Sequence, residues 1–312
     1  MATLTVSPSV SPRDDAMELY RAFKGIGCDG AAVIRILAHR DASQRLLIQQ
    51  EYKSMYSEEL TKRLRSELTG KFEDAMLLWM LNGPQRDASL VRKALESSDP
   101  LCVTEVICSR TPSQIQVFKQ HYHAMYGTYL ENDISSYITG DHGALLHAYA
   151  SNPRYEGPEV RNEEVESDVK ALYKAGEKRF GTDEKTFIRI LSQRSRAHIA
   201  TVNAAYKKSH GRSLKKAIKK ETSGHFETAL LTIVECADNP AKYFGKVLHK
   251  AMKGMGTNDS MLIRVIVTRT EIDMHYIVAE YLKKYKKPLK DAVRSETSGN
   301  YRAFLLELLG PN

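Results

Sequence analysis

The sequence lacks the features that would place it in a membrane or in a disulfide-rich class. It contains no run of about 18 consecutive apolar residues, so we do not expect a membrane-spanning helix. Its first residues, MATLTVSPSVSPRDD, lack the basic start and apolar stretch of a secretory signal. The 4 cysteines form no CxxC pair and no zinc-binding spacing, which favours reduced thiols. We therefore expect a cytoplasmic protein.

Motifs that commonly mark an active site are also missing. The sequence has no GxxxxGK[ST], no HExxH and no EF-hand loop. No catalytic residue is predicted, and we do not expect the chain to be an enzyme. A secondary peroxidase or nucleotide hydrolase activity stays open as an alternative.

The composition is that of an ordinary folded protein with a basic surface. Of its 312 residues, 42% are hydrophobic and 27% are charged, which is enough apolar material for a substantial core. The 46 Lys and Arg residues exceed the 38 Asp and Glu residues, so the net charge is +8. This charge favours a polyanionic partner such as nucleic acid or an anionic lipid surface, and by itself it chooses neither.

A four-fold internal repeat organises the chain. Each copy has an Arg that closes an apolar run, and a Tyr, a Leu and a Gly follow this anchor at the same three intervals in every copy. The four columns are Arg40, Arg110, Arg194 and Arg269; Tyr52, Tyr122, Tyr206 and Tyr281; Leu60, Leu130, Leu214 and Leu289; and Gly70, Gly140, Gly224 and Gly299. Such agreement across independent columns indicates repeated supersecondary units.

Each repeat is predicted to be all-α, with about five short helices. Before Arg40, Arg194 and Arg269, apolar residues recur at helical spacing. Such short runs could also be strands, but length and context favour helix, and the prolines fall at the edges of periodic segments. The predicted organisation is a short N-terminal tail (1–13), a first repeat (14–83), a second (84–150), a connector (151–167), a third (168–238) and a fourth (239–312). Because the connector carries Pro, Gly and many charges, we expect it to be a hinge between two halves.

A loop glycine and a distant glutamate occur together in three of the four repeats. The glycines Gly27, Gly181 and Gly256 precede their anchor Arg by one fixed interval, and Glu67, Glu221 and Glu296 follow it by another. The second repeat has Ser97 and Tyr137 at these positions and so lacks both. The joint loss indicates that loop and glutamate serve one site.

Oxygen coordination of a cation is the chemistry that such a pair suits. A helix that ends at glycine leaves its last carbonyls without intrahelical partners, and glycine allows the backbone to turn them toward one point. Three carbonyls and a bidentate carboxylate supply five oxygens, whereas Ca²⁺ takes about 6–8. The remaining positions would suit an external phosphate or carboxylate.

These loops and glutamates resemble those of the annexin family over about residues 14–310. The segments RYEGPE (154–159) and LLWM (77–80), with Cys28 in place of Thr, resemble its plant branch. The resemblance implies a curved disc of four repeats that binds anionic phospholipid membranes reversibly and peripherally through calcium. It also implies ligands in three repeats, with carbonyls in each loop and one Glu: Phe23, Gly25, Gly27 and Glu67; Gly176, Arg179, Gly181 and Glu221; Met252, Gly254, Gly256 and Glu296. Replacement of Thr by Cys28 is expected to weaken the helix cap and leave the backbone ligands intact.

Several segments have a structural and a functional interpretation. Gly25 to Gly30 matches GxGxxG, but a helical stretch precedes it, which disfavours a nucleotide site. Ile26, Phe180 and Met255 either touch lipid or pack locally. The plant resemblance suggests a peroxidase role for His39 and a redox role for Cys108 and Cys236, although structural roles are favoured.

Protein and nucleic-acid partners are the remaining alternatives. Ile34-Arg35-Ile36 and Ile188-Arg189-Ile190 resemble a string proposed for actin contact in the plant branch, although both lie on the repeating core helix. The run of lysines at 215–220 is interpreted as a solvated helix face, with contact to an anionic surface as a secondary role. A helical-repeat module that binds nucleic acid is an alternative that we disfavour.

Overall fold

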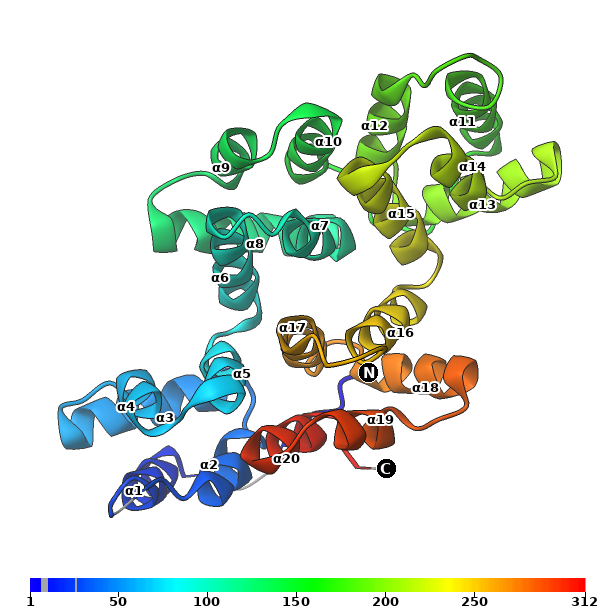
Figure 1. Cartoon of the computed structure of the whole chain (residues 1–312). Coiled ribbons are helices and arrows are strands. Elements are labelled where there is room, and N and C mark those ends of the chain that lie inside the picture. The colour runs from blue at the N-terminus through cyan, green and yellow to red at the C-terminus, as the bar shows by residue number, and fades with distance from the viewer. Residues whose placement is uncertain (7–10, 26, 312) are drawn as a thin grey trace. The chain divides into compact units, whose positions relative to one another are not determined.

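The computed structural model describes residues 1–6, 11–25 and 27–311, and within these ranges every regular element is a helix (Figure 1). The first repeat contains α1 (Pro12–Ala22), α2 (Gly30–Leu37), α3 (Ala42–Tyr56), α4 (Leu60–Glu67) and α5 (Gly70–Met80). The second contains α6 (Gly83–Glu96), α7 (Pro100–Ser109), α8 (Pro112–Tyr126), α9 (Leu130–Tyr137) and α10 (Gly140–Ser151). The third contains α11 (Asn162–Ala175), α12 (Glu184–Gln193), α13 (Arg196–His210), α14 (Leu214–Glu221) and α15 (Gly224–Asp238). The fourth contains α16 (Pro240–Ala251), α17 (Asp259–Arg269), α18 (Met274–Tyr285), α19 (Leu289–Glu296) and α20 (Gly299–Leu308). The all-α prediction of about five helices per repeat is confirmed.

The repeated sequence columns fix equivalent points of the four repeats. The column leucines open the fourth helix of each repeat, and all four are completely buried. The column glycines open the fifth helix with φ between 57° and 68°, a left-handed conformation that most other residues avoid. The column tyrosines are buried as well. One sequence period therefore corresponds to one structural unit.

The anchor arginines are structural, as predicted. Arg40 forms a two-pronged pair with Asp15 of α1 at 2.7 and 2.8 Å, and Arg110 pairs in the same way with Asp87 of α6 at 2.6 and 2.7 Å. In the third repeat Arg194 pairs with Asp168 of α11. Each pair ties the end of the second helix of a repeat to its first helix through charge-assisted hydrogen bonds.

In the fourth repeat the anchor arginine pairs with a different partner. Arg269 pairs with Asp273, four residues further along the chain, at 2.7 and 2.6 Å. Its guanidinium also lies 4.5 Å from the centre of the Phe244 ring. Phe244 precedes Arg269 by the same interval by which Asp15 precedes Arg40. A cation–π contact thus replaces the carboxylate of the first helix.

The helices form two compact units. One unit contains residues 1–86 and 244–312, and the other contains residues 87–243. The first and fourth repeats therefore pack together, as do the second and third. The expected connector is shorter than predicted, because α11 already begins at Asn162, and it lies inside the second unit. The prediction that it divides the chain into halves is wrong, since the divisions fall within α6 and α16.

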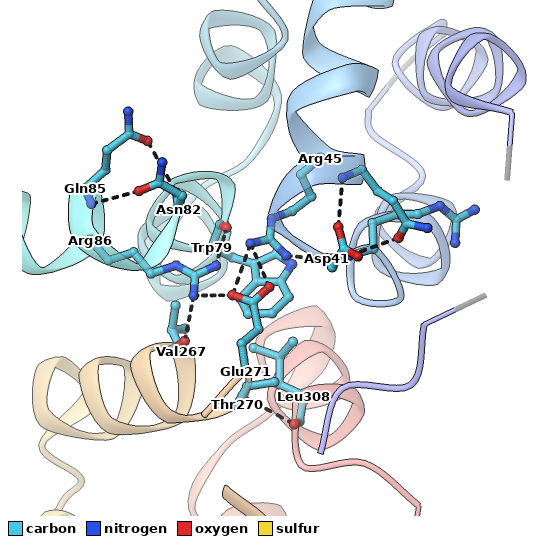
Figure 2. Close-up of polar contacts among 12 residues, drawn as sticks. Asp41, Arg45, Trp79, Asn82, Gln85, Arg86, Val267, Thr270, Glu271 and Leu308 are labelled. Atoms are coloured by element: carbon cyan, nitrogen blue, oxygen red, sulfur yellow. Dashed lines mark hydrogen bonds and ion pairs between the residues drawn. The ribbon is translucent and has the colours of Figure 1, made fainter. Parts of the chain in front are cut away.

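The core of the first unit is built around Trp79, whose side chain is completely buried. Its indole N–H donates to the carbonyl oxygen of Leu37 at 2.8 Å. The guanidinium groups of Arg45 and Arg86 lie over the ring, 3.9 and 4.4 Å from its centre, and both reach Glu271 (Figure 2). The core thus combines aromatic packing with a buried ionic group.

The second unit has a continuous apolar core of its own. Every helix from α6 to α15 contributes buried side chains to it, among them Phe118, Tyr122, Phe187 and Tyr206. Asn152, just after α10, donates to the hydroxyl of Ser192 at 3.1 Å and so links the second and third repeats. Among the residues that the structure describes, no helix is both long and apolar enough to cross a membrane.

Candidate metal centres

Three loops between a first and a second helix share one backbone closure. In the first repeat the N–H of Asp29 donates to the carbonyl of Ala22 at 2.9 Å. The equivalent bonds are Asp183 to Ala175 at 2.8 Å in the third repeat and Asn258 to Ala251 at 2.8 Å in the fourth. This bond brings the end of one helix against the start of the next, and the glycines Gly25, Gly27, Gly254 and Gly256 between them are exposed in a loop that we call the bulge. The predicted carbonyl ligands lie in these bulges.

Glycine is needed to form the bulges of the first and fourth repeats. Gly25 and Gly27 have φ values of 119° and 86°, and Gly254 and Gly256 have nearly the same values of 111° and 90°. Residues with a side chain rarely adopt such angles. The two loops therefore have matching conformations at their glycines, as the matching sequences predicted.

Each predicted glutamate is the final residue of a fourth helix. Glu67 ends α4, Glu221 ends α14 and Glu296 ends α19. The side chains of Glu67 and Glu221 are mostly buried, with 19% and 11% exposed. Tyr137 ends α9 in the second repeat and is 48% exposed. Helix length therefore places the carboxylates at equivalent points of the three repeats.

In the first repeat an arginine connects the loop to the glutamate. Nη2 of Arg63, on α4, lies 3.0 Å from the carbonyl oxygen of Phe23 and 2.9 Å from Oε1 of Glu67. Two of the predicted ligand oxygens thus lie within hydrogen-bonding distance of the same nitrogen atom. Arg63 was not among the predicted residues, although the repeats carry the signal, since the equivalent positions of the third and fourth repeats hold Ala217 and Ala292.

A threonine connects the loop to the glutamate in the other two repeats. The hydroxyl of Thr257 donates to Oε2 of Glu296 at 2.7 Å, and the hydroxyl of Thr182 donates to the backbone oxygen of Glu221 at 2.7 Å. Cys28 occupies this position in the first repeat. The expectation that Cys28 weakens a helix cap is wrong, because the cap of α2 is Asp29, which accepts from the N–H of Ala32.

The loop of the third repeat differs from the other two. The carbonyl of Gly176, a predicted ligand, already accepts the N–H of Arg179 at 3.1 Å. Gly176 also packs against the glutamate, since a Cβ there would lie 3.0 Å from Cγ of Glu221. Gly181 has a φ of 76°. Loop and glutamate are therefore adjacent in this repeat too, with a tighter local turn.

The second repeat has lost its loop as well as its glutamate. Its closing bond, from the N–H of Asp99 to the carbonyl of Ala94 at 2.8 Å, encloses four residues, whereas the equivalent bond of the first repeat encloses six. Ser98 takes a φ of 55° in the shortened turn. The bulge that would present carbonyls is therefore absent from this described segment, a difference that the residue types at positions 97 and 137 do not specify.

A cation at the three complete loops would depend on main-chain oxygen. Within the described ranges, no group of three or more His, Cys, Asp or Glu side chains could hold a metal. Each loop offers carbonyls and a single carboxylate, which are hard donors of the kind that calcium prefers. The bridging guanidinium of Arg63 is itself a cation held by these oxygens. The donor set therefore fits calcium better than a soft metal.

The loop tips of the third and fourth repeats carry large apolar side chains that are exposed to solvent. Phe180 and Met255 are fully exposed, at 105% and 106% of the reference area. Neither packs locally, which removes the structural alternative for these two residues. Ile26, the third residue predicted to touch lipid, lies outside the described residues.

The residues that had both a functional and a structural interpretation make contacts within the fold. His39 meets the backbone oxygen of Thr5 at 3.2 Å and the carboxylate of Glu307 at 3.4 Å. Of the two Ile-Arg-Ile segments, Ile34, Ile36 and Ile190 are buried, whereas Arg35 is exposed. Burial raises the pKa of the Cys108 thiol, and neighbouring Cys236 adds to this effect, so Cys108 is held protonated. Ile34, Ile36, Ile190 and Cys108 thus pack in the core, whereas Arg35 is exposed and His39 is partly exposed.

Fold and site together define a class of protein. Its members are built from helical repeats, and in this chain three of the four repeats carry a loop next to a carboxylate. The annexin family model matches residues 14–79, 86–149, 167–233 and 243–308. The chain is 48% identical to Annexin D5 of Arabidopsis thaliana, with all of both chains covered. The solved structure of annexin III superposes with a TM-score of 0.96 at 36% identity, covering 100% of this chain and 97% of that one. Calcium-bound annexin (Sm)1 superposes with a TM-score of 0.86 at 26% identity, covering 100% and 93%. The chain belongs to the annexin family, and the similarity to a plant member confirms the predicted branch.

Proposed function

We propose that this annexin binds anionic phospholipid membranes in a calcium-dependent manner. The observation that carries the proposal is the threefold pairing of a bulged loop with a glutamate at a constant spacing. Glu67 follows Gly27 at the same interval at which Glu221 follows Gly181 and Glu296 follows Gly256. The second repeat, with a shorter loop and Tyr137, serves as an internal contrast.

The ligands proposed for each site come from one loop and one helix end. In the first and fourth repeats they are the carbonyls of Phe23, Gly25 and Gly27 with Glu67, and those of Met252, Gly254 and Gly256 with Glu296. In the third repeat they are the carbonyls of Gly176, Arg179 and Gly181 with Glu221. Bound calcium would supply a divalent charge with open coordination positions for a lipid phosphate or carboxylate. One carboxylate per site suggests weak affinity without lipid, about 10⁻⁴–10⁻³ M.

The protein's own residues would then hold the membrane surface beside the loops. Phe180 and Met255 are positioned to enter the interface, because they are fully exposed at two loop tips. Lys219 and Lys220 are exposed on α14, the helix that ends at Glu221. Basic residues near an anionic leaflet contribute about 1 kcal/mol each. Linkage requires that lipid tighten calcium binding as much as calcium tightens lipid binding.

This mechanism is a bridge between protein and lipid and includes no chemical step. It suits a cytoplasmic protein that moves reversibly to membranes. Actin binding through the Ile-Arg-Ile segments is disfavoured, because Ile34, Ile36 and Ile190 are buried and so cannot contact a partner. The described polar neighbours of His39, Thr5 and Glu307, form no catalytic arrangement. Nucleic-acid binding would rest on net charge alone.

Sedimentation with phosphatidylserine vesicles tests the proposal. The wild type is expected to sediment with calcium and to remain in solution with a chelator at physiological salt. The triple variant Glu67→Gln, Glu221→Gln, Glu296→Gln should lose calcium-dependent sedimentation, since each substitution keeps the shape and removes the charge. Tyr137→Phe, at the equivalent position of the second repeat, is the matched control. Undiminished sedimentation of the triple variant would refute the assignment.

A further inference from the structure

We propose that Arg63 is a tethered cation that competes with calcium for the first-repeat site, so that this site loads at a higher calcium concentration than the fourth-repeat site. The inference rests on the proposed function, because it assigns a regulatory residue to one of the proposed sites. It concerns a side chain outside the predicted ligand set.

The geometry places one positive group between two oxygens that calcium would need. Nη2 of Arg63 is 3.0 Å from the Phe23 carbonyl and 2.9 Å from Oε1 of Glu67. The guanidinium carbon is also 5.9 Å from the centre of the Phe23 ring. Because calcium approaches its oxygens to about 2.3–2.6 Å, two cations sharing this pair of oxygens would lie almost in contact. Loading of the site therefore requires Arg63 to move away.

The side chain is free to make that movement. It is 33% exposed, and its partner Glu67 is 19% exposed. A long arginine stem can leave its head group in water while the aliphatic part stays on the helix. The displaced guanidinium would lose one ion pair and one hydrogen bond, and calcium binding must offset that loss. Calcium binding at the first site thus carries a free-energy cost that depends on Arg63.

The fourth repeat shows the contrasting arrangement. Ala292 occupies the position equivalent to Arg63 and is 4% exposed. Glu296 accepts a hydrogen bond from the neutral hydroxyl of Thr257. The first repeat differs at both points, with Cys28 where the threonine would stand and Arg63 where the alanine would stand. A positive partner has therefore replaced a neutral one beside the glutamate of the first repeat.

The third repeat has a cation near its glutamate in a different position. Nζ of Lys220 lies 3.5 Å from Oε1 of Glu221, and 60% of the lysine side chain is exposed. This ion pair includes no loop carbonyl, and Ala217 occupies the position equivalent to Arg63. Because an exposed lysine can leave into water at little cost, the comparison that isolates the effect of Arg63 is with the fourth repeat.

An opposite role would also be consistent with these contacts and is separated by experiment. Arg63 could hold Glu67 and the loop in the shape that calcium needs, in which case its removal would weaken calcium binding. Competition predicts that removal strengthens calcium binding. The direction of the change in affinity thus decides between the two roles.

The test isolates the first site in the full-length chain. Glu221→Gln and Glu296→Gln are introduced together, and calcium is titrated without lipid by isothermal titration calorimetry. Adding Arg63→Ala to this parent should tighten calcium binding about 10-fold, a change of about 1.4 kcal/mol. Arg65→Ala, an exposed residue on the same helix that removes an equal charge, should change the affinity less than about twofold. Arg63→Met, which retains the unbranched stem, repeats the measurement if the alanine variant folds poorly.

Two further readouts separate the outcomes. Glu67→Gln added to the Arg63→Ala variant should abolish the tightened binding, which would locate it at this site. Binding that depends on Glu67 but is unchanged or weaker in both Arg63 variants would overturn the inference and leave the proposed function intact. Absence of any calcium binding dependent on Glu67, with Arg63 present or replaced, would overturn the inference and the assignment of a calcium site to the first repeat, and vesicle sedimentation of the wild type would still test the proposed function through the other two sites.

Discussion

Glu271 and Arg86 form a buried ion pair, with Oε2 of the carboxylate 2.7 Å from Nη1 of the guanidinium. The same carboxylate lies 3.3 Å from Arg45, so one negative charge serves two buried positive charges (Figure 2). Arg45 is completely buried and Arg86 has 1% of its side chain exposed. The two pairs therefore link the turn after α17 to α3 and to the first turn of α6, all within the first unit.

Replacing Glu271 by Gln should destabilise the first unit by about 3 kcal/mol, since removal of one partner leaves buried charges without compensation. This value is at the lower end of the range for buried pairs, because Glu271 retains 19% exposure. Urea unfolding followed by the fluorescence of the single tryptophan, Trp79, measures the change where it occurs. Glu59→Gln, which removes a surface partner of Lys53, should cost less than about 1 kcal/mol. Equal losses in both variants would contradict this account.

The carboxylate of Glu271 should also make the stability of the first unit sensitive to acid. Burial alone would raise the pKa of Glu271, but Arg86 and Arg45 outweigh it and hold this pKa below its ordinary value of 4.5. A depressed folded-state pKa means that the unfolded state binds the proton first as pH falls. The stabilisation is therefore complete above pH 4.5 and is lost as pH falls through the folded-state value. Unfolding free energies measured from about pH 6 to about pH 3 should fall more steeply for wild type than for Glu271→Gln.

The fold could be predicted well because its structural determinants recur at fixed intervals. Leu60 and Gly70 mark helix starts that reappear in all four repeats, so comparison within one chain was sufficient. The compact units could not be predicted in this way, since the contact between Arg86 and Glu271 joins residues that are 185 positions apart. A Pro- and Gly-bearing connector signals a break in local structure and says nothing about which repeats pack together.

The candidate site was predicted in part for a similar reason. Gly27 and Glu67 occupy matching repeat positions, and glycine conformation follows from local sequence. The roles of Arg63 and Thr257 depend on how a side chain crosses from helix or loop to a neighbouring segment, which spacing does not specify. The shortened loop of the second repeat depends on the backbone pairing of Asp99 with Ala94, which residue types alone do not specify.

That shortened loop leads to a prediction about restoring a site. Tyr137→Glu alone should add no calcium-binding site, because four residues between Ala94 and Asp99 leave no bulge. Replacing residues 95–98 by the segment 252–257 together with Tyr137→Glu should add one site. Calcium bound per chain in the presence of phosphatidylserine vesicles measures the outcome. A gain from Tyr137→Glu alone would show that loop length is not the limiting factor.

The exposed loop tips lead to a prediction about lipid attachment. Phe180→Ala and Met255→Ala should each weaken vesicle binding about fivefold, which corresponds to partial burial of one large apolar side chain. Calcium affinity without lipid and thermal stability should be unchanged, since both side chains are fully exposed. Leu46→Ala, at an exposed leucine of α3, is the control and should leave vesicle binding unaltered. An equal loss from the control would indicate a general effect of surface hydrophobicity.

The central claim concerns where calcium binds, and a crystal structure with calcium and a short-chain phosphatidylserine tests it most directly. The account predicts metal density at the loops of the first, third and fourth repeats, each ion in contact with its glutamate, Glu67, Glu221 or Glu296. It also predicts that the loop between Ala94 and Asp99 stays without metal. Calcium located only elsewhere on the chain, with these three glutamates contacting no ion, would contradict it.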